Sequence, residues 1–156
     1  MKKLTALAAL LALLTAPAMA AWKISPDGAA LLEGDGSSSL SVICDKINGQ
    51  TSWLVRVDAL GLREIKATSV EVSFKPAGRW AYKVLGENRN GFIAIDDRNM
   101  PTKSDMQGLL SRLKAASTVT VTIADGATGS ASQTHNFTLA GSRKAIAGVE
   151  KTCQAK

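Results

Sequence analysis

The segment FTLAGSRKAIAGVEKTC, residues Phe137–Cys153, ends three residues before the C-terminus of the 156-residue chain. Its sequence predicts a strand, a turn at Gly141 and then a short amphipathic helix that ends in a cysteine. At about 100° per residue, the apolar residues of this helix fall on one face: Ala145, Ile146, Val149 and Cys153. The cysteine is therefore expected to point towards the body of the domain, either as a reactive thiol, as a metal ligand or as half of a disulfide.

The N-terminus has the organisation of a secretory signal peptide. Two lysines precede the apolar run Leu4–Thr15, and the small residues of Ala18–Ala20 suit signal peptidase. We expect cleavage after Ala20, which separates a signal peptide at 1–20 from a single domain at 21–156. The apolar run is shorter than the roughly 20 residues that span a bilayer, so no membrane anchor is predicted. A periplasmic or secreted protein is expected.

The redox state of the cysteines follows from this compartment. Cys44 and Cys153 are the two cysteines of the chain, and Cys44 ends the apolar run LSVIC. An even number of cysteines in an exported protein typically indicates disulfide bonding. We therefore predict a Cys44–Cys153 bond that clamps the C-terminal helix to the strand at Leu40–Cys44.

The rest of the chain alternates short β-prone runs with turn residues, a pattern typical of a sandwich or a barrel. The predicted strands lie at 22–25, 29–33, 40–44, 52–59, 69–74, 79–84, 92–96, 118–124 and 134–140. An apolar stripe predicts a first helix at about 103–116, with Thr102 or Ser104 as its N-cap. The predicted fold class is mainly β: an antiparallel β-sandwich of seven to nine strands with two short α-helices, the C-terminal one clamped by the disulfide.

Residues suited to catalysis are few. His135 is the one histidine of the sequence, and we expect it at an outward position on a strand. Asp96 and Asp97 are neighbours whose side chains should point to opposite faces, which prevents them from sharing a proton. The sequence contains no nucleophile elbow, phosphate loop or dinucleotide fingerprint. We therefore predict that the protein is not an enzyme and uses no cofactor and no metal.

The charge of the chain is mildly basic. Its formal net charge is +6, or +4 once the two signal-peptide lysines are removed. This charge suits anionic partners such as cell-wall polymers, whereas nucleic acid is not expected for an exported protein without a concentrated basic block. A protein or a cell-envelope component is the expected partner, and the oligomeric state stays open.

The first candidate partner-binding group is the basic and aromatic run Arg79, Trp80, Tyr82 and Lys83. Period-2 alternation separates these side chains onto two faces of a strand. The preferred interpretation is therefore that the two aromatic side chains belong to the core and that the two cations are solvated.

The second candidate group lies on the first turn of the C-terminal helix, at Ser142, Arg143 and Lys144. Cations are unfavourable at a helix N-terminus, where free N–H groups attract anions. A phosphate- or carboxylate-binding site is one interpretation of this turn, and a plain surface helix is the other.

The order of these elements resembles two groups of small exported proteins. The shared pattern comprises the segments WKIS, SLSVIC and WLVRVDA and, most sharply, Phe137, Leu139, Gly141, Ala145, Ile146 and Cys153 together with Cys44. This pattern is similar to that of β-sandwich proteins of the invasion associated locus B type and of the type VI secretion-associated VasI/TagO group. The resemblance implies a non-enzymatic periplasmic domain with one disulfide.

Three functional hypotheses follow. The first is an accessory or adaptor protein that binds a protein or an envelope component without catalysis, as the invasion associated locus B type implies. The alternative is an inhibitor or immunity protein that blocks a cell-wall hydrolase with a loop such as GENRNG, Gly86–Gly91, or a type VI secretion accessory protein. A hydrolase is the third.

Overall fold

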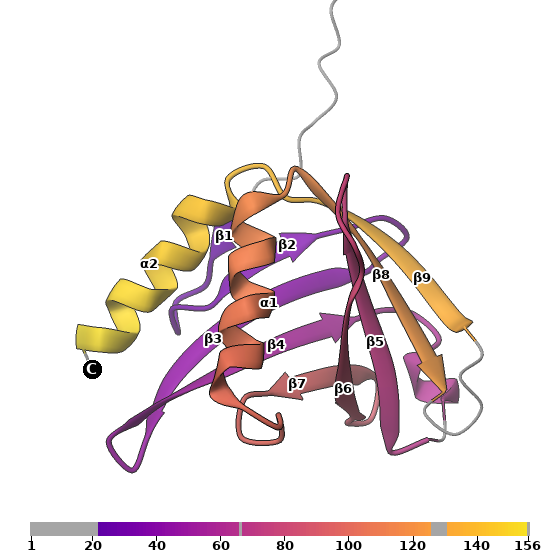
Figure 1. Cartoon of the computed structure of the whole chain (residues 1–156), viewed down its shortest axis with the longest axis horizontal. Coiled ribbons are helices and arrows are strands. Elements are labelled where there is room, and N and C mark those ends of the chain that lie inside the picture. The colour runs from indigo at the N-terminus through magenta and orange to yellow at the C-terminus, as the bar shows by residue number, and fades with distance from the viewer. Residues whose placement is uncertain (1–21, 66, 126–130, 156) are drawn as a thin grey trace, which may run out of the picture.

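Antiparallel pairing joins all nine strands of the described chain into one continuous sheet. The computed structural model describes residues 22–65, 67–125 and 131–155, and within them it contains nine strands and two α-helices (Figure 1). The predicted signal peptide, with its cleavage after Ala20, lies outside the described residues. The strands are β1 (Lys23–Ile24), β2 (Ala30–Glu33), β3 (Ser39–Ile47), β4 (Gln50–Asp58), β5 (Ser69–Pro76), β6 (Tyr82–Asn88), β7 (Phe92–Asp96), β8 (Thr118–Asp125) and β9 (Ala131–Thr138).

The strand order is β1-β2-β3-β4-β7-β6-β5-β8-β9. The sheet bends between β7 and β6, where the ladder consists of only two pairs, Glu87 with Ala94 and Asn88 with Ile93. In Figure 1, strands β3, β4 and β7 run across the view, whereas β5, β6 and β8 cross them steeply. The predicted sandwich is thus built by one sheet that bends over itself, and the mainly β, antiparallel fold class is confirmed.

Alternation of apolar residues places the core between the two parts of the sheet. On β5, Val70, Val72 and Phe74 are fully buried, as the sequence predicts. Their partners in the core cluster come from both parts, including Val55 on β4 and Val121 on β8. Side chains of the inner face therefore form one shared core, the expected consequence of period-2 patterning on a sheet that covers itself.

Helix α1 (Lys103–Ala115) covers the open side of this core (Figure 1). Its N-cap is Thr102, whose backbone N–H and hydroxyl both donate to the Asp105 carboxylate, at 3.1 Å and 3.0 Å. This arrangement satisfies groups that the helix itself leaves unpaired. The predicted apolar stripe is buried: Met106, Leu109, Leu110 and Leu113.

Helix α2 (Ser142–Ala155) packs beside α1 and is bonded to β3. Its apolar face is buried as predicted, and the Cys44–Cys153 disulfide joins it to β3 with Cα atoms 5.7 Å apart. The Lys114 ammonium lies 2.5 Å from the Glu150 carboxylate, which links the two helices. The predicted clamp is therefore confirmed, and a disulfide fits an oxidising compartment. In the described ranges, neither helix combines the length and the apolar character that crossing a membrane demands.

We predict that the double variant Cys44→Ser, Cys153→Ser loses roughly 4–5 kcal/mol of unfolding free energy. The bond joins residues 109 positions apart, and removing it restores the entropy of a long loop to the unfolded chain. Urea unfolding followed by circular dichroism measures the loss, with reduced wild-type protein as the control. Equal midpoints for oxidised wild type and the double variant would contradict the prediction.

Candidate functional site

Among the residues that the structure describes, no strand lies beside one edge of β6 over most of its length. On the other edge, Tyr82 to Gly86 pair with β5, while β7 reaches only Glu87 and Asn88. The Asn88 N–H donates to the Thr68 carbonyl on the β5 side, at 2.8 Å. Backbone groups alternate in direction along a strand. The N–H and C=O groups of Lys83 and Leu85 therefore point away from β5, towards the open edge.

The hairpin that follows supports this alternation. The Arg89 N–H donates to the Phe92 carbonyl at 2.9 Å, on the β7 side, so odd-numbered residues of this stretch face β7. In the described part of the chain, no strand pairs with Lys83 or Leu85 on that side. Two N–H donors and two C=O acceptors are thus left without a neighbouring strand.

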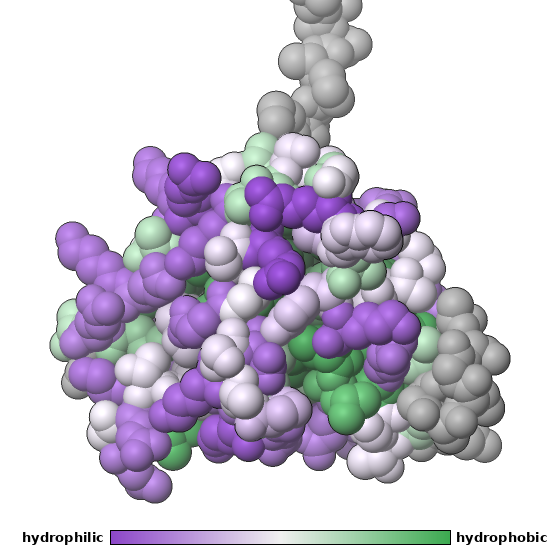
Figure 2. Space-filling model, viewed as in Figure 1, coloured by the Kyte–Doolittle hydropathy of each residue, from purple (hydrophilic) through white to green (hydrophobic). Residues whose placement is uncertain are grey.

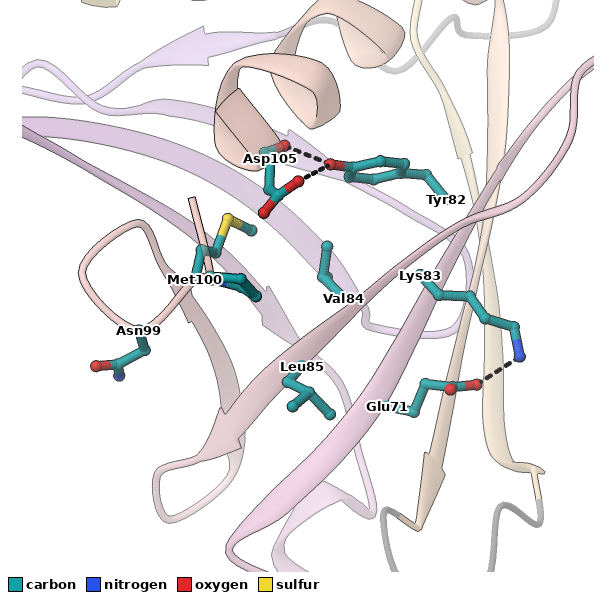
Figure 3. A pocket seen from close by; sticks show the side chains of 9 residues that line it. Glu71, Tyr82, Lys83, Val84, Leu85, Asn99, Met100 and Asp105 are labelled. Carbon is teal, nitrogen blue, oxygen red and sulfur yellow. Dashed lines mark hydrogen bonds and ion pairs between the residues drawn. The ribbon is translucent and has the colours of Figure 1, made fainter. Parts of the chain in front are cut away.

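A groove of about 320 Å³ lies between this edge and the loop that joins β7 to α1. Val84 and Leu85 form one wall, and Met100 and Pro101 form the other (Figure 3). Leu85 is 66% exposed. Figure 2 shows a hydrophobic patch over β6 bordered by hydrophilic side chains. The groove therefore combines apolar walls with unpaired backbone groups.

Tyr82 closes one end of the groove and fixes it to α1. Its hydroxyl donates to the Asp105 carbonyl at 2.8 Å, and the Arg112 guanidinium carbon lies 4.3 Å from its ring centroid. Burial raises the pKa of Tyr82, and the nearby Asp105 carboxylate raises it further, because both disfavour the phenolate. Tyr82 therefore stays a neutral hydrogen-bond donor that holds the first turn of α1 against β6 (Figure 3).

Two buried carboxylates fix the loop that forms the far wall. Asp96 is almost fully buried and accepts bonds from the Arg98 Nε at 2.9 Å and the Arg98 backbone N–H at 3.0 Å. Asp97 accepts from the Ser52 hydroxyl and the Trp53 N–H of β4, both at 2.9 Å. The two carboxylates bind different partners, Asp96 within its own loop and Asp97 on β4. The bond from Arg98 holds the pKa of Asp96 below its ordinary value.

The basic and aromatic run is only partly a strand, and the expectation of two core aromatic side chains is wrong for Trp80. Trp80 is 94% exposed, whereas Tyr82 is half-buried in the groove. The reason is the turn before β6, where the Arg79 N–H donates to the Pro76 carbonyl and the strand begins only at Tyr82. Arg79 is exposed, and Lys83 forms an ion pair of 2.8 Å with Glu71 beside the groove.

The second candidate group lies at the other end of α1. Ser142 is buried and its hydroxyl donates to the Leu113 carbonyl at 2.8 Å, whereas Arg143 and Lys144 are exposed. The structure does not bring this turn together with the groove, because the groove meets the first turn of α1 and Ser142 meets its last. Anion binding at Arg143 and Lys144 stays a prediction, and the serine hydroxyl already has a partner.

His135 differs from its predicted outward position. It pairs with the buried Val121 across β8 and β9, so its side chain lies on the inner face, where it is half-buried at the sheet edge. Its Nε2 lies 3.1 Å from the Gln133 Oε1. The outward expectation failed because the strand register places residue 135 on the same face as Phe137. Among the residues that the structure describes, no three His, Cys, Asp or Glu side chains are grouped to hold a metal.

No family model, curated protein or solved structure matches the chain.

We predict alternating amide exchange along β6 in the free protein. The N–H groups of Lys83 and Leu85 face the open edge, so they should exchange with deuterium about tenfold or more faster than those of Val84 and Gly86, which face β5. Exchange followed by nuclear magnetic resonance gives each rate. Uniform protection from residue 82 to residue 86 would show that another group covers the edge.

A second prediction concerns acid stability. Because the folded-state pKa of Asp96 is lowered from 3.8, its contribution is fully present above that value and is lost as the pH falls through the lower folded pKa. Asp96→Asn should therefore lower the urea midpoint most at neutral pH, and the difference from wild type should shrink below about pH 3.8. Glu64→Gln, at an exposed position, is the control. A difference that does not depend on pH would contradict this role.

Proposed function

We propose that the chain is a non-catalytic accessory protein of the periplasm or the extracellular space that binds a protein or a cell-envelope component in the β6 groove. The observation that carries this proposal is the open edge of β6 with its apolar walls, next to a hairpin that presents Trp80 almost entirely to solvent. Tryptophan is enriched among the residues that dominate binding energy at interfaces. A hairpin that leaves an indole in water beside an apolar groove is therefore suited to contact with a partner.

The compartment and the class of protein have separate support. The disulfide fits an oxidising environment, as does the signal-peptide pattern of the sequence. The resemblance to the invasion associated locus B type supports an accessory role without catalysis, and a type VI secretion accessory remains an alternative of the same class. An accessory protein of either type would use the groove as its contact surface.

The hydrolase-inhibitor alternative requires a loop that enters an active site, and the candidate for this loop is GENRNG, Gly86–Gly91. The structure places Gly86 to Asn88 in β6, and the tight turn that follows has positive φ at Asn90 and Gly91. The Asn88 side-chain amide donates to the Ile65 carbonyl at 2.5 Å. The segment thus consists of the end of β6 and a tight hairpin turn, and no observation favours it as the part that would enter an active site.

The proposal predicts partner contact at Leu85 and Trp80 and none at Leu60, an equally apolar exposed leucine that lies outside the groove. A photoreactive phenylalanine placed at each position in turn should cross-link to one discrete envelope component at residues 80 and 85 only. Trp80→Ala should then weaken capture of that component by roughly thirtyfold, the loss expected of an interface hot spot. Its urea midpoint should be unchanged, because an exposed side chain contributes little to folding.

Leu60→Ser serves as the matched control for Leu85→Ser in the same capture assay. Cross-linking at residue 60 that equals cross-linking at residue 85, or capture that survives both Trp80→Ala and Leu85→Ser, would remove the groove as the contact surface.

A further inference from the structure

We propose that the groove binds its partner by strand addition: an extended polypeptide segment of another protein lies along β6 and pairs with the outward N–H and C=O groups of Lys83 and Leu85. This inference rests on the proposed function and specifies how the same site recognises its partner. The ligand class is an unfolded or extended segment, because only an extended backbone presents donors and acceptors at the spacing of a strand.

The backbone of β6 supplies the first argument. An unpaired strand edge is a template for another chain, and proteins ordinarily cover, shorten or charge such edges. Here the edge runs beside an apolar groove, and its outer face carries Leu85, which is 66% exposed. Lys83 is the one charged residue on the open stretch, and its ammonium is engaged with Glu71 at 2.8 Å. The edge is therefore left available rather than protected.

The side-chain pattern supplies the second argument. Alternate residues of an added strand face opposite sides of the sheet. Side chains on the inner side would enter the cavity between Val84 and Met100, while those on the outer side would lie over Leu85 (Figure 3). The segment should therefore carry an apolar residue at the inner position. The residue next to it, which faces the outer side, should be polar, because it would lie near the Lys83–Glu71 ion pair.

The shape of the groove decides between a foreign segment and a second copy of the chain. Asn99, Met100 and Pro101 form a wall opposite the edge, and the first turn of α1 closes one end through the Tyr82–Asp105 bond. A cavity of about 320 Å³ holds a few residues of extended chain. A second copy would bring the same wall with its own β6 edge, whereas a single extended segment brings none. A single extended segment fits.

The test separates backbone recognition from side-chain recognition. Random nonapeptides displayed on phage are selected against disulfide-intact wild-type protein, and the most enriched peptide is synthesised with a fluorophore. Binding is then measured by fluorescence anisotropy for wild type, Lys83→Pro and Lys83→Ala. Proline removes the outward N–H without removing a bond to β5, because that N–H faces the open edge. Both variants remove the ion pair with Glu71.

We expect the enriched peptides to alternate apolar and polar residues. Lys83→Pro should weaken binding about tenfold or more, which corresponds to 1.4 kcal/mol, whereas Lys83→Ala should change it by less than about threefold. Because the proline could disturb β6 itself, deuterium exchange of the wild-type protein provides a second measurement. On adding the peptide, the amides of Lys83 and Leu85 should become protected from deuterium exchange, with little change at Val84.

The remaining outcomes are distinct. Peptides that lose binding with Leu85→Ser and Trp80→Ala, yet bind Lys83→Pro and Lys83→Ala equally and protect neither amide, would overturn strand addition and leave the groove as a contact surface. Failure to enrich any peptide, or enriched peptides that ignore all of these variants, would overturn strand addition, whereas the groove as a contact surface is decided separately by the cross-linking at residues 80 and 85. Self-association that Lys83→Pro abolishes in sedimentation would identify a second copy as the occupant and overturn the foreign segment.

Discussion

Gly86 lies on β6 beside the bend in the sheet, where the packed core leaves no room for a side chain. A Cβ atom at this position would lie 2.5 Å from the Ile93 Cγ2 on β7 and 3.1 Å from the Val72 Cγ2 on β5. Any side chain at this position would displace the Ile93 and Val72 methyl groups from their places in the core. With glycine in place, β6 crosses close to β7, pairs with it over two positions and diverges. The shared core fills one side of the bend, and the open edge of β6 begins where the two strands diverge.

The two helices hold this geometry through a chain of specific bonds. Tyr82 joins the first turn of α1 to β6, and Ser142 joins the last turn of α1 to the first turn of α2. The disulfide then anchors the last turn of α2 to β3. Each helix is therefore attached at both ends. These bonds connect β6, beside the groove, through α1 and α2 to β3. Such a site is positioned by rigid elements rather than by a free loop.

Local pattern in the sequence accounts for most of the elements and for little of the site. Alternation at Val70, Val72 and Phe74 was sufficient to place β5 and its buried face, and the apolar stripe with Thr102 placed α1. The cysteine count, together with the signal-peptide pattern of the N-terminus, predicted the disulfide. Trp80 was misassigned because periodicity does not reveal where a hairpin turn ends and its second strand begins. The groove could not be predicted, because it forms only when the sheet bends between β6 and β7 and the loop from β7 to α1 comes to lie opposite β6.

The exposed indole of Trp80 also gives the protein an internal optical reporter. Trp53 is buried and Trp22 is half-buried, whereas Trp80 is 94% exposed, so a collisional quencher such as iodide reaches chiefly one of the three fluorophores. The quenchable fraction of the emission then reports on the hairpin beside β6, while the shielded fraction reports on the core. Occupancy of the groove and integrity of the fold can thus be followed separately in one cuvette, without attaching a label to the chain.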